Sequence, residues 1–229
     1  MYKHFFKRFF DIFFVILFFL LIWPVYVVLT ILVRVKLGAP VIFKQIRPGK
    51  NGKLFTLYKF RSMNDKKDES GNLLPDEERL TKFGKSLRAT SLDELPELFN
   101  ILKGEMSFIG PRPLLVKDYV FFDDEVMKRQ SVRPGLSGLA QVNGRNNITW
   151  EKKFEYDLEY VNKITFFKDL KILFKTIGKV FKKSDIDKDG FATDEDYGDY
   201  LLRTNKINAD YYNQQINESN RLKEEYYKN

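Results

Sequence analysis

The chain of 229 residues contains no cysteine and a single histidine, His4. Without cysteine, it forms no disulfide bond and offers no thiolate to a metal ion. One histidine ahead of a long apolar segment excludes a multi-histidine zinc site, and it excludes a Ser-His-Asp triad farther along the chain. Any acid–base or nucleophilic chemistry therefore falls to carboxylates, lysine, tyrosine or hydroxyl groups.

Acidic residues are outnumbered in the first part of the chain and collect near its end. Residues 1–184 carry 33 basic and 20 acidic side chains, whereas residues 185–229 carry 6 basic and 11 acidic ones. A basic body favours polyanionic partners such as nucleic acid, anionic lipid or a phosphorylated substrate. We expect no nucleic-acid partner, because the sequence lacks zinc-finger spacing, an aromatic RNP-like strand and a basic zipper.

Charge is absent from the 22 residues between Ile12 and Val33, a length that suffices to cross a bilayer. The run is too long for a secretory signal and lacks its cleavage site, so we predict a retained membrane element. Basic residues flank both ends, which places both on the cytoplasmic face. Pro24, at the middle, favours a kink. The residues leave two arrangements open: a helix that enters and leaves on one face, and a spanning helix that tolerates a proline.

The rest of the chain predicts an α+β fold. Two apolar runs, 41–46 and 54–60, flank a Pro-Gly-Lys-Asn-Gly turn and predict a β-hairpin, with Lys59 near its end. Polar residues 65–79 predict a loop. A stripe of apolar residues from Phe166 to Val180, with lysines beside it, predicts a basic amphipathic helix at the membrane surface or on the core. Other helices are predicted over 78–88, 114–130 and 150–162.

Adjacent carboxylates, Asp93 and Glu94, stand at the start of an apolar helical run. A Gly-Pro-Arg-Pro turn presents Arg112 farther on. This combination suits metal-assisted phosphoryl transfer: a carboxylate attacks phosphorus, Mg²⁺ joins it to a phosphate, and arginine binds the phosphate oxygens. Ser91 and Glu94 also have the spacing of a capping box, so the plain alternative is a helix N-terminus with acidic residues in its first turn.

Four basic residues are candidate phosphate ligands: Lys59, Arg88, Arg112 and Arg145. Arg88 ends a predicted helix close to Asp93. Arg145 lies in the glycine-rich stretch 131–147, where backbone N–H groups can approach an anion closely. This stretch lacks the spacing of a Walker loop or a dinucleotide fingerprint. Asp157 could serve the site or pair structurally with an arginine or lysine.

Residues 185–196 nearly match an EF-hand calcium loop. Aspartates occupy positions 1, 3 and 5 and a glycine position 6, but position 12 is Asp196 instead of glutamate, and no second hand is present. We therefore favour an acidic linker over a Ca²⁺ site that regulates the protein. From Asp199 on, the composition predicts a polar tail, weakly helical or disordered.

Several ordered motifs together resemble the bacterial sugar transferase family, the small monotopic phosphoglycosyl transferases. The first is the apolar segment with its central proline. The others are Tyr-Lys-Phe-Arg-Ser-Met (58–63), Ser-Leu-Asp-Glu-Leu-Pro (91–96), Gly-Pro-Arg-Pro (110–113) and the stretch 133–145. The resemblance covers about residues 1–183, and the chain looks most like the minimal members that transfer phospho-diacetylbacillosamine to undecaprenyl phosphate.

The resemblance implies a reaction and a place. A UDP-sugar donates a sugar 1-phosphate to polyprenyl phosphate, and UMP is released. Asp93 is implied as the nucleophile that forms a phosphosugar–enzyme intermediate and binds Mg²⁺, with Glu94 as its partner. The membrane helix is implied to re-enter at Pro24 without crossing, which places the enzyme on membrane lipid at the cytoplasmic face of the bacterial inner membrane.

These observations predict three parts: a membrane helix over 1–36, a catalytic domain over 37–184, and an acidic tail over 185–229. The competing hypothesis, from a different class, is a non-catalytic, membrane-anchored basic module that binds anionic lipid or nucleic acid. Such a module would release no UMP, and its binding would weaken steeply with salt.

Overall fold

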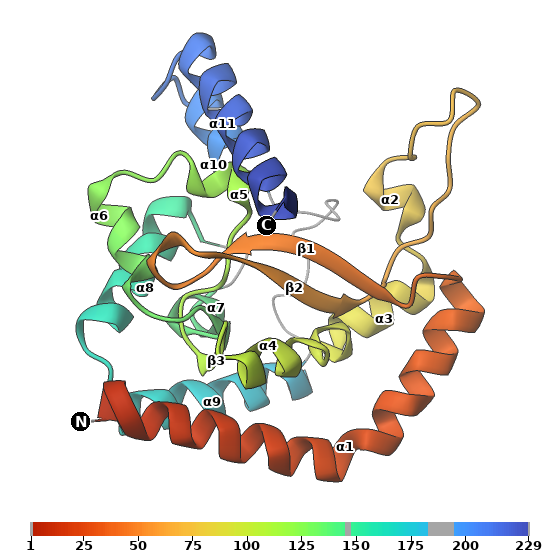
Figure 1. The fold of residues 1–229 in the computed structure, drawn as a ribbon, viewed down its shortest axis with the longest axis vertical. Coiled ribbons are helices and arrows are strands. Elements are labelled where there is room, and N and C mark those ends of the chain that lie inside the picture. The colour runs from red at the N-terminus through yellow and green to blue at the C-terminus, as the bar shows by residue number, and fades with distance from the viewer. Residues whose placement is uncertain (1, 145–147, 183–194, 229) are drawn as a thin grey trace.

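The computed structural model describes residues 2–144, 148–182 and 195–228. Figure 1 shows helices arranged around a short β-hairpin, which confirms the predicted α+β class. The strands are β1 (Ile42–Pro48), β2 (Leu54–Phe60), β3 (Ser107–Ile109) and β4 (Gly135–Ser137). The helices are α1 (Lys7–Leu37), α2 (Asp76–Arg79), α3 (Lys82–Ala89), α4 (Glu97–Lys103), α5 (Val116–Tyr119), α6 (Asp124–Met127), α7 (Leu139–Val142), α8 (Trp150–Asn162), α9 (Phe166–Lys182), α10 (Tyr197–Arg203) and α11 (Ala209–Lys228).

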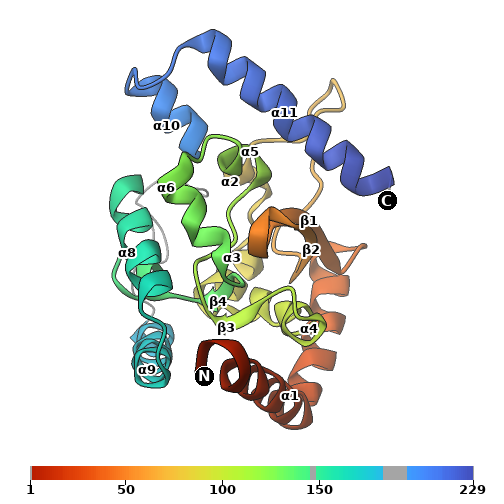
Figure 2. The ribbon, with the colours of Figure 1, turned by 60° about the vertical axis from the view of Figure 1, so that its left-hand side comes forward.

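The predicted hairpin is confirmed and occupies the middle of the molecule. β1 and β2 pair antiparallel, with Ile42 opposite Phe60 and Pro48 opposite Leu54. In Figures 1 and 2 the hairpin lies between α4 on one side and α11 on the other. Phe55 and Leu57 of β2 are buried in one cluster with the apolar side chains of α4. A second sheet pairs β3 with β4 in parallel.

The apolar N-terminal segment forms α1, a helix of 31 residues that contains Pro24. Within the described parts of the chain, it is the one helix long and apolar enough to cross a membrane. It changes direction about midway along its length (Figure 1). Few of its side chains are buried, and Leu20 and Leu21 are 70% and 68% exposed. Because water does not favour an apolar surface of this extent, α1 is a membrane-associating element.

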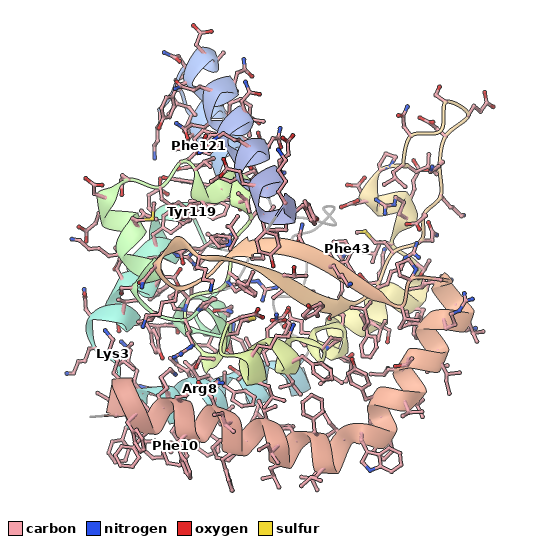
Figure 3. The ribbon with its side chains drawn as sticks, in the orientation of Figure 1. Lys3, Arg8, Phe10, Phe43, Tyr119 and Phe121 are labelled. Carbon is pink, nitrogen blue, oxygen red and sulfur yellow. The ribbon has the colours of Figure 1, made fainter. Side chains whose placement is uncertain are left out.

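Polar contacts tie the N-terminal half of α1 to the rest of the fold. Arg8 donates to two backbone carbonyls at the C-terminal end of α4, at 2.5 and 2.8 Å; Figure 3 labels Arg8. The buried carboxylate of Asp11 accepts from the Ser107 hydroxyl and from the backbone N–H of Phe108, each at 3.0 Å. Lys7 forms an ion pair with Asp169 of α9 at 2.6 Å. The membrane helix is therefore packed into the fold.

The amphipathic helix predicted over 166–180 is present as α9. It lies beside the first half of α1 in both ribbon views (Figures 1 and 2). Ile172 faces the core at 1% exposure, whereas Phe167 and Phe174 are 78% and 64% exposed. The exposed aromatic rings of α9 thus extend the apolar surface of α1, which fits a helix lying at a membrane interface.

Two predicted helices are broken in the structure. The helix expected over 78–88 is divided into α2 and α3, because the Thr81 side chain accepts from the N–H of Gly84 and starts a new helix there. The segment 114–130 consists of α5, α6 and a 3₁₀ turn at Lys128–Ser131, with Asp123 capping α6. In both places a side chain that caps the backbone overrides the longer helical pattern.

The C-terminal segment is more ordered than its composition predicts. α10 and α11 pack on the region around α5, where Tyr212 stacks on Phe121 with ring centroids 5.7 Å apart. Figure 3 labels Phe121, which lies beside the C-terminal helices. The Tyr226 hydroxyl lies 2.9 Å from the hydroxyl of Thr56 on β2. These aromatic contacts hold the polar C-terminal segment against the rest of the fold. The segment predicted to be a weakly helical or disordered tail therefore forms two packed helices, α10 and α11. Most of the calcium-loop lookalike, residues 185–194, lies outside the described residues.

Gly84 allows α3 to approach the end of the hairpin. A Cβ atom at this position would lie 1.8 Å from the backbone oxygen of Ser62, whereas one at Gly178 of α9 would meet nothing within 4 Å. We expect Gly84→Ala to lower the free energy of unfolding by about 2–3 kcal/mol, because α3 must move away. Gly178→Ala should leave it unchanged or raise it by up to about 1 kcal/mol. Thermal unfolding in detergent compares the two, and equal effects would contradict this account.

Candidate active site

Asp93 and Glu94 lie on a 3₁₀ turn, Leu92–Glu94, between α3 and α4. Ser91 enters this turn in the left-handed region at φ 54° and makes no capping hydrogen bond through its side chain. The capping-box interpretation of this stretch is therefore wrong. Leu92 and Leu95 pack into a cluster with side chains from the second half of α1. The turn that carries both carboxylates thus rests on the membrane helix.

Glu94 joins three segments of the chain. Its Oε1 accepts from Lys59 Nζ at 2.9 Å and from Arg112 Nη2 at 2.8 Å. Lys59 comes from β2 and Arg112 from the Gly-Pro-Arg-Pro loop, so the structure brings together three residues that the sequence singled out. The Glu94 side chain is 10% exposed. Charge-assisted hydrogen bonds at such a buried position are strong.

Glu97 is a member of the same cluster that the sequence analysis missed. Its Oε1 lies 3.2 Å from Lys59 Nζ, and its side chain is 2% exposed. Burial, opposed by the charge of Lys59, raises the pKa of Glu97 to about 7. The sequence contained one signal for its role: Glu97 follows Glu94 by three residues, a spacing that can place both side chains on the same side of a helical turn.

Asp93 differs from Glu94 in having a free carboxylate. It is 7% exposed, and no hydrogen bond or ion pair joins it to any residue that the structure describes. Burial, and then the neighbouring charge of Glu94, raises the pKa of Asp93 to about 6. Lys59, Arg88 and Arg112 oppose this rise, so these cations lie close enough to act on the carboxylate. Asp93 is therefore a buried carboxylate whose oxygens remain available for chemistry.

Arg112 is held firmly and yet remains accessible. The charge of Glu94 is the main cause of the raised pKa of Arg112, while the side chain is still 36% exposed. The backbone oxygen of Arg112 accepts from Arg129 at 2.7 Å, and that of Pro113 accepts from Arg47 at 3.2 Å. Two guanidinium groups thus fix the loop, and the Arg112 side chain can meet an anion.

Asp157 has a structural partner. It accepts from two nitrogens of Arg129, at 2.8 and 3.0 Å, and both side chains are almost completely buried. Of the two roles left open for Asp157, the structure therefore supports the ion pair. Because Arg129 also binds the backbone of Arg112, this pair contributes to the site through the loop that it supports.

The two remaining candidate cations differ in what the structure says of them. Arg88 lies at the end of α3, where its Nε donates to the Ser62 hydroxyl at 3.0 Å. The positive charge of Arg88 lowers the pKa of Asp93. Arg88 therefore lies close enough to Asp93 to belong to the site. Arg145 lies outside the described residues, and its role as a phosphate ligand stays a prediction.

The donor set fits a magnesium ion that is shared with a substrate. Among the described residues, no group of three His, Cys, Asp or Glu side chains is arranged to hold a metal ion. Mg²⁺, however, commonly takes one or two carboxylates and completes its octahedron with water and substrate phosphates. The uncommitted oxygens of Asp93 meet that requirement, whereas Oε1 of Glu94 is occupied by Lys59 and Arg112.

The different environments of two buried aspartates predict opposite effects on stability. At neutral pH, an ionised carboxylate with a pKa near 6 costs the folded state about 3 kcal/mol relative to an ordinary aspartate. We therefore expect Asp93→Asn to raise the melting temperature in magnesium-free buffer at pH 7. The gain should vanish as the pH falls below about 4, where the carboxyl group is protonated in both states.

Asp157→Asn serves as the matched comparison for Asp93→Asn. Burial raises the pKa of Asp157 as well, but Asn at this position leaves Arg129 buried without its counter-charge. The unpaired guanidinium outweighs the relief of the buried carboxylate, and we expect a loss of about 3 kcal/mol. Thermal unfolding monitored by circular dichroism measures both variants. A loss of stability in Asp93→Asn at pH 7 would show that this carboxylate has a structural partner after all.

Comparisons with known proteins find sugar transferases among the relatives of this chain. EpsL of Bacillus subtilis, an uncharacterized sugar transferase, is 54% identical over 164 residues, which are 72% of this chain and 81% of EpsL. A UDP-glucose:undecaprenyl-phosphate glucose-1-phosphate transferase of Klebsiella pneumoniae is 43% identical over 70% of this chain. The undecaprenyl-phosphate galactose phosphotransferase of Salmonella typhimurium is 39% identical over 64%.

The chain spans only part of the last two relatives, 37% and 34% of their lengths. The family model of the bacterial sugar transferases matches residues 2–183. This match includes α1, the hairpin and every residue of the cluster around Glu94, and it ends before α10 and α11. The chain therefore belongs to the bacterial sugar transferase family.

Proposed function

We propose that this protein transfers a sugar 1-phosphate from a UDP-sugar to polyprenyl phosphate and releases UMP. The observation that carries the proposal is the contrast between the two adjacent carboxylates. Asp93 is buried and uncommitted, whereas Glu94 is held by Lys59 and Arg112. The names of relatives supply the substrate class, because two of them are transferases that act on undecaprenyl phosphate.

The contrast between the carboxylates gives each residue a role. In the first step, an oxygen of Asp93 attacks the phosphorus that bears the sugar. The bond from this phosphorus to the UMP oxygen breaks, and UMP leaves with the electron pair. In the second step, a phosphate oxygen of the polyprenyl acceptor attacks the same phosphorus and releases the Asp93 carboxylate. Glu94 holds Lys59 and Arg112 in place, and these cations meet the charge on the phosphoryl oxygens.

Magnesium fits this scheme as a shared ion. When bound, Mg²⁺ neutralises charge on the diphosphate and draws electron density from the phosphorus that is attacked. Asp93 is the residue that would hold it, together with phosphate oxygens of the donor. Arg112 and Lys59 approach the remaining oxygens, and Arg88 adds positive charge beside Asp93.

The packing of α1 supports a helix that re-enters the membrane without crossing. A straight helix of 31 residues would be about 45 Å long, so its two ends would reach opposite faces of a bilayer. Here both ends contact the same body of the protein. Lys7 pairs with Asp169, while Val33 and Leu37 pack in one cluster with Phe60 of the hairpin. Because that body lies on one side of the membrane, we propose that both ends face the cytoplasm.

This topology can be tested cleanly because the chain has no native cysteine. We expect single-cysteine variants Lys3→Cys and Lys36→Cys both to resist a membrane-impermeant maleimide in intact spheroplasts, and both to react after permeabilisation. The cysteine-free parent controls for background labelling. If one of the two positions reacts in intact spheroplasts, the helix spans the membrane.

The reaction itself is tested by UMP release from a panel of UDP-sugars, with Mg²⁺, polyprenyl phosphate and detergent-solubilised protein. The panel includes UDP-glucose and UDP-galactose, which match the names of relatives, and UDP-diacetylbacillosamine, which the resemblance to one branch of the family implies. We expect release with one donor and a loss of at least about 10³-fold in Asp93→Asn, because the substitution removes the nucleophile of the proposed first step. Removal of Mg²⁺ should also abolish release.

Two results would contradict the proposal. Undiminished turnover by Asp93→Asn would exclude the covalent mechanism. Absence of release from every donor, with the protein shown to be folded, would favour the non-catalytic basic module; salt-sensitive binding to anionic vesicles or to nucleic acid would then support that alternative.

A further inference from the structure

The ammonium group of Lys59 lies between two carboxylates. Its Nζ is 2.9 Å from Oε1 of Glu94 and 3.2 Å from Oε1 of Glu97. An ammonium group has three N–H donors. One of them is donated to Glu94, and Glu97 lies within ion-pair distance. The structure shows no further partner of the ammonium group among the described residues, so a donor remains for another acceptor. The Lys59 side chain is 17% exposed, so this donor is within reach of a bound anion.

Glu97 itself is too deeply buried to touch a substrate, because only 2% of its side chain is exposed. Its position is fixed from behind by Asn100, one turn farther along α4. The Asn100 side chain accepts from the N–H of Tyr58 at 3.2 Å and donates to the backbone oxygen of Thr56 at 2.7 Å. This amide clamps α4 to β2, so Glu97 stays next to Lys59.

Glu94 alone would hold Lys59 poorly. The same Oε1 atom of Glu94 also accepts from Arg112, so the two cations share one oxygen and repel each other. A second acceptor on the other side of the ammonium group counteracts this repulsion and fixes the direction of the lysine side chain. Glu97 is the residue that supplies this acceptor.

We propose that Glu97 is a positioning residue of the transferase, which aims the free donor of Lys59 at a phosphoryl oxygen of the substrate. The inference rests on the proposed function and adds to it the residue that controls Lys59. Glu97 acts by offering an acceptor oxygen to the ammonium group of Lys59. Burial raises its pKa to about 7, so its neutral form is readily accessible near neutral pH. A glutamine, which keeps an acceptor oxygen at the same place, should therefore replace it.

The experiment compares Glu97→Gln with Glu97→Leu, which has a similar size and no acceptor, in the UMP-release assay. We expect Glu97→Gln to keep kcat/KM within about threefold of the wild type. Glu97→Leu should lose about tenfold or more, the effect of removing a hydrogen bond to a charged group. Melting temperatures of both variants show whether they are folded. Equal activity of Glu97→Leu and the wild type would overturn the proposal, and so would an equal loss in both variants.

A double-mutant cycle with Lys59→Met separates positioning from a general effect on the fold. If Glu97 acts through Lys59, adding Glu97→Leu to Lys59→Met should lower kcat/KM no further. The same tenfold loss in both backgrounds would mean that Glu97 acts independently of Lys59, which overturns the proposal.

Failure of the proposed function has a different signature. A wild-type chain that releases no UMP from any donor refutes the transferase, and the positioning role with it. An active wild type with an active Glu97→Leu variant refutes only the role of Glu97.

Discussion

The site depends on one cluster of charged side chains. In it, Glu94 pairs with both Lys59 and Arg112, and Glu97 pairs with Lys59 from the other side. The cluster joins strand β2, the turn of Leu92–Glu94, helix α4 and the Gly-Pro-Arg-Pro loop. Buried charges are costly unless each has a partner. The raised pKa values of Asp93 and Glu97 show that this cost is only partly offset. Free energy from packing elsewhere in the fold must therefore hold the cluster together.

That packing comes largely from the membrane helix and from α4. Side chains in the second half of α1 pack against Leu92 and Leu95, the residues on either side of the two carboxylates. Arg8, in its first half, places positive charge at the C-terminal end of α4, where the helix dipole is negative. A helix that acts only as an anchor would need neither contact. The same element that reaches the lipid therefore supports the turn that bears the carboxylates, which suits a reaction with a lipid-borne acceptor.

The sequence predicted those parts of the molecule where local pattern and structure agree. The apolar run of α1, the hairpin around Asn51 and Gly52, and the amphipathic α9 follow from periodicity and turn chemistry. The sequence also singled out Asp93, Glu94 and Arg112, because adjacent carboxylates and a proline-flanked arginine are unusual, and Lys59 as a cation near the end of the hairpin. Their convergence on one oxygen of Glu94 could not be seen in the sequence, since it depends on how β2 packs on α4.

The features that the sequence missed or misrepresented have a common cause. Glu97 looks like an ordinary acidic residue in a first helical turn until the fold places Lys59 beside it. The order of α11 depends on Phe121 and Thr56, which lie far away in the sequence. The capping-box spacing of Ser91 and Glu94 was misleading, because Glu94 is drawn to two cations and Ser91 adopts a left-handed turn. Tertiary contacts decide each of these cases.

The central claim is that Asp93, and not Glu94 or Glu97, becomes bonded to the sugar phosphate. The most direct test is to incubate the protein with the accepted UDP-sugar and Mg²⁺ in the absence of polyprenyl phosphate, followed by acid quenching and intact-mass analysis with peptide mapping. The account predicts a mass increase equal to one sugar phosphate, located at Asp93 and lost when polyprenyl phosphate is added. An adduct on another residue, or turnover with no adduct at any time, would contradict it.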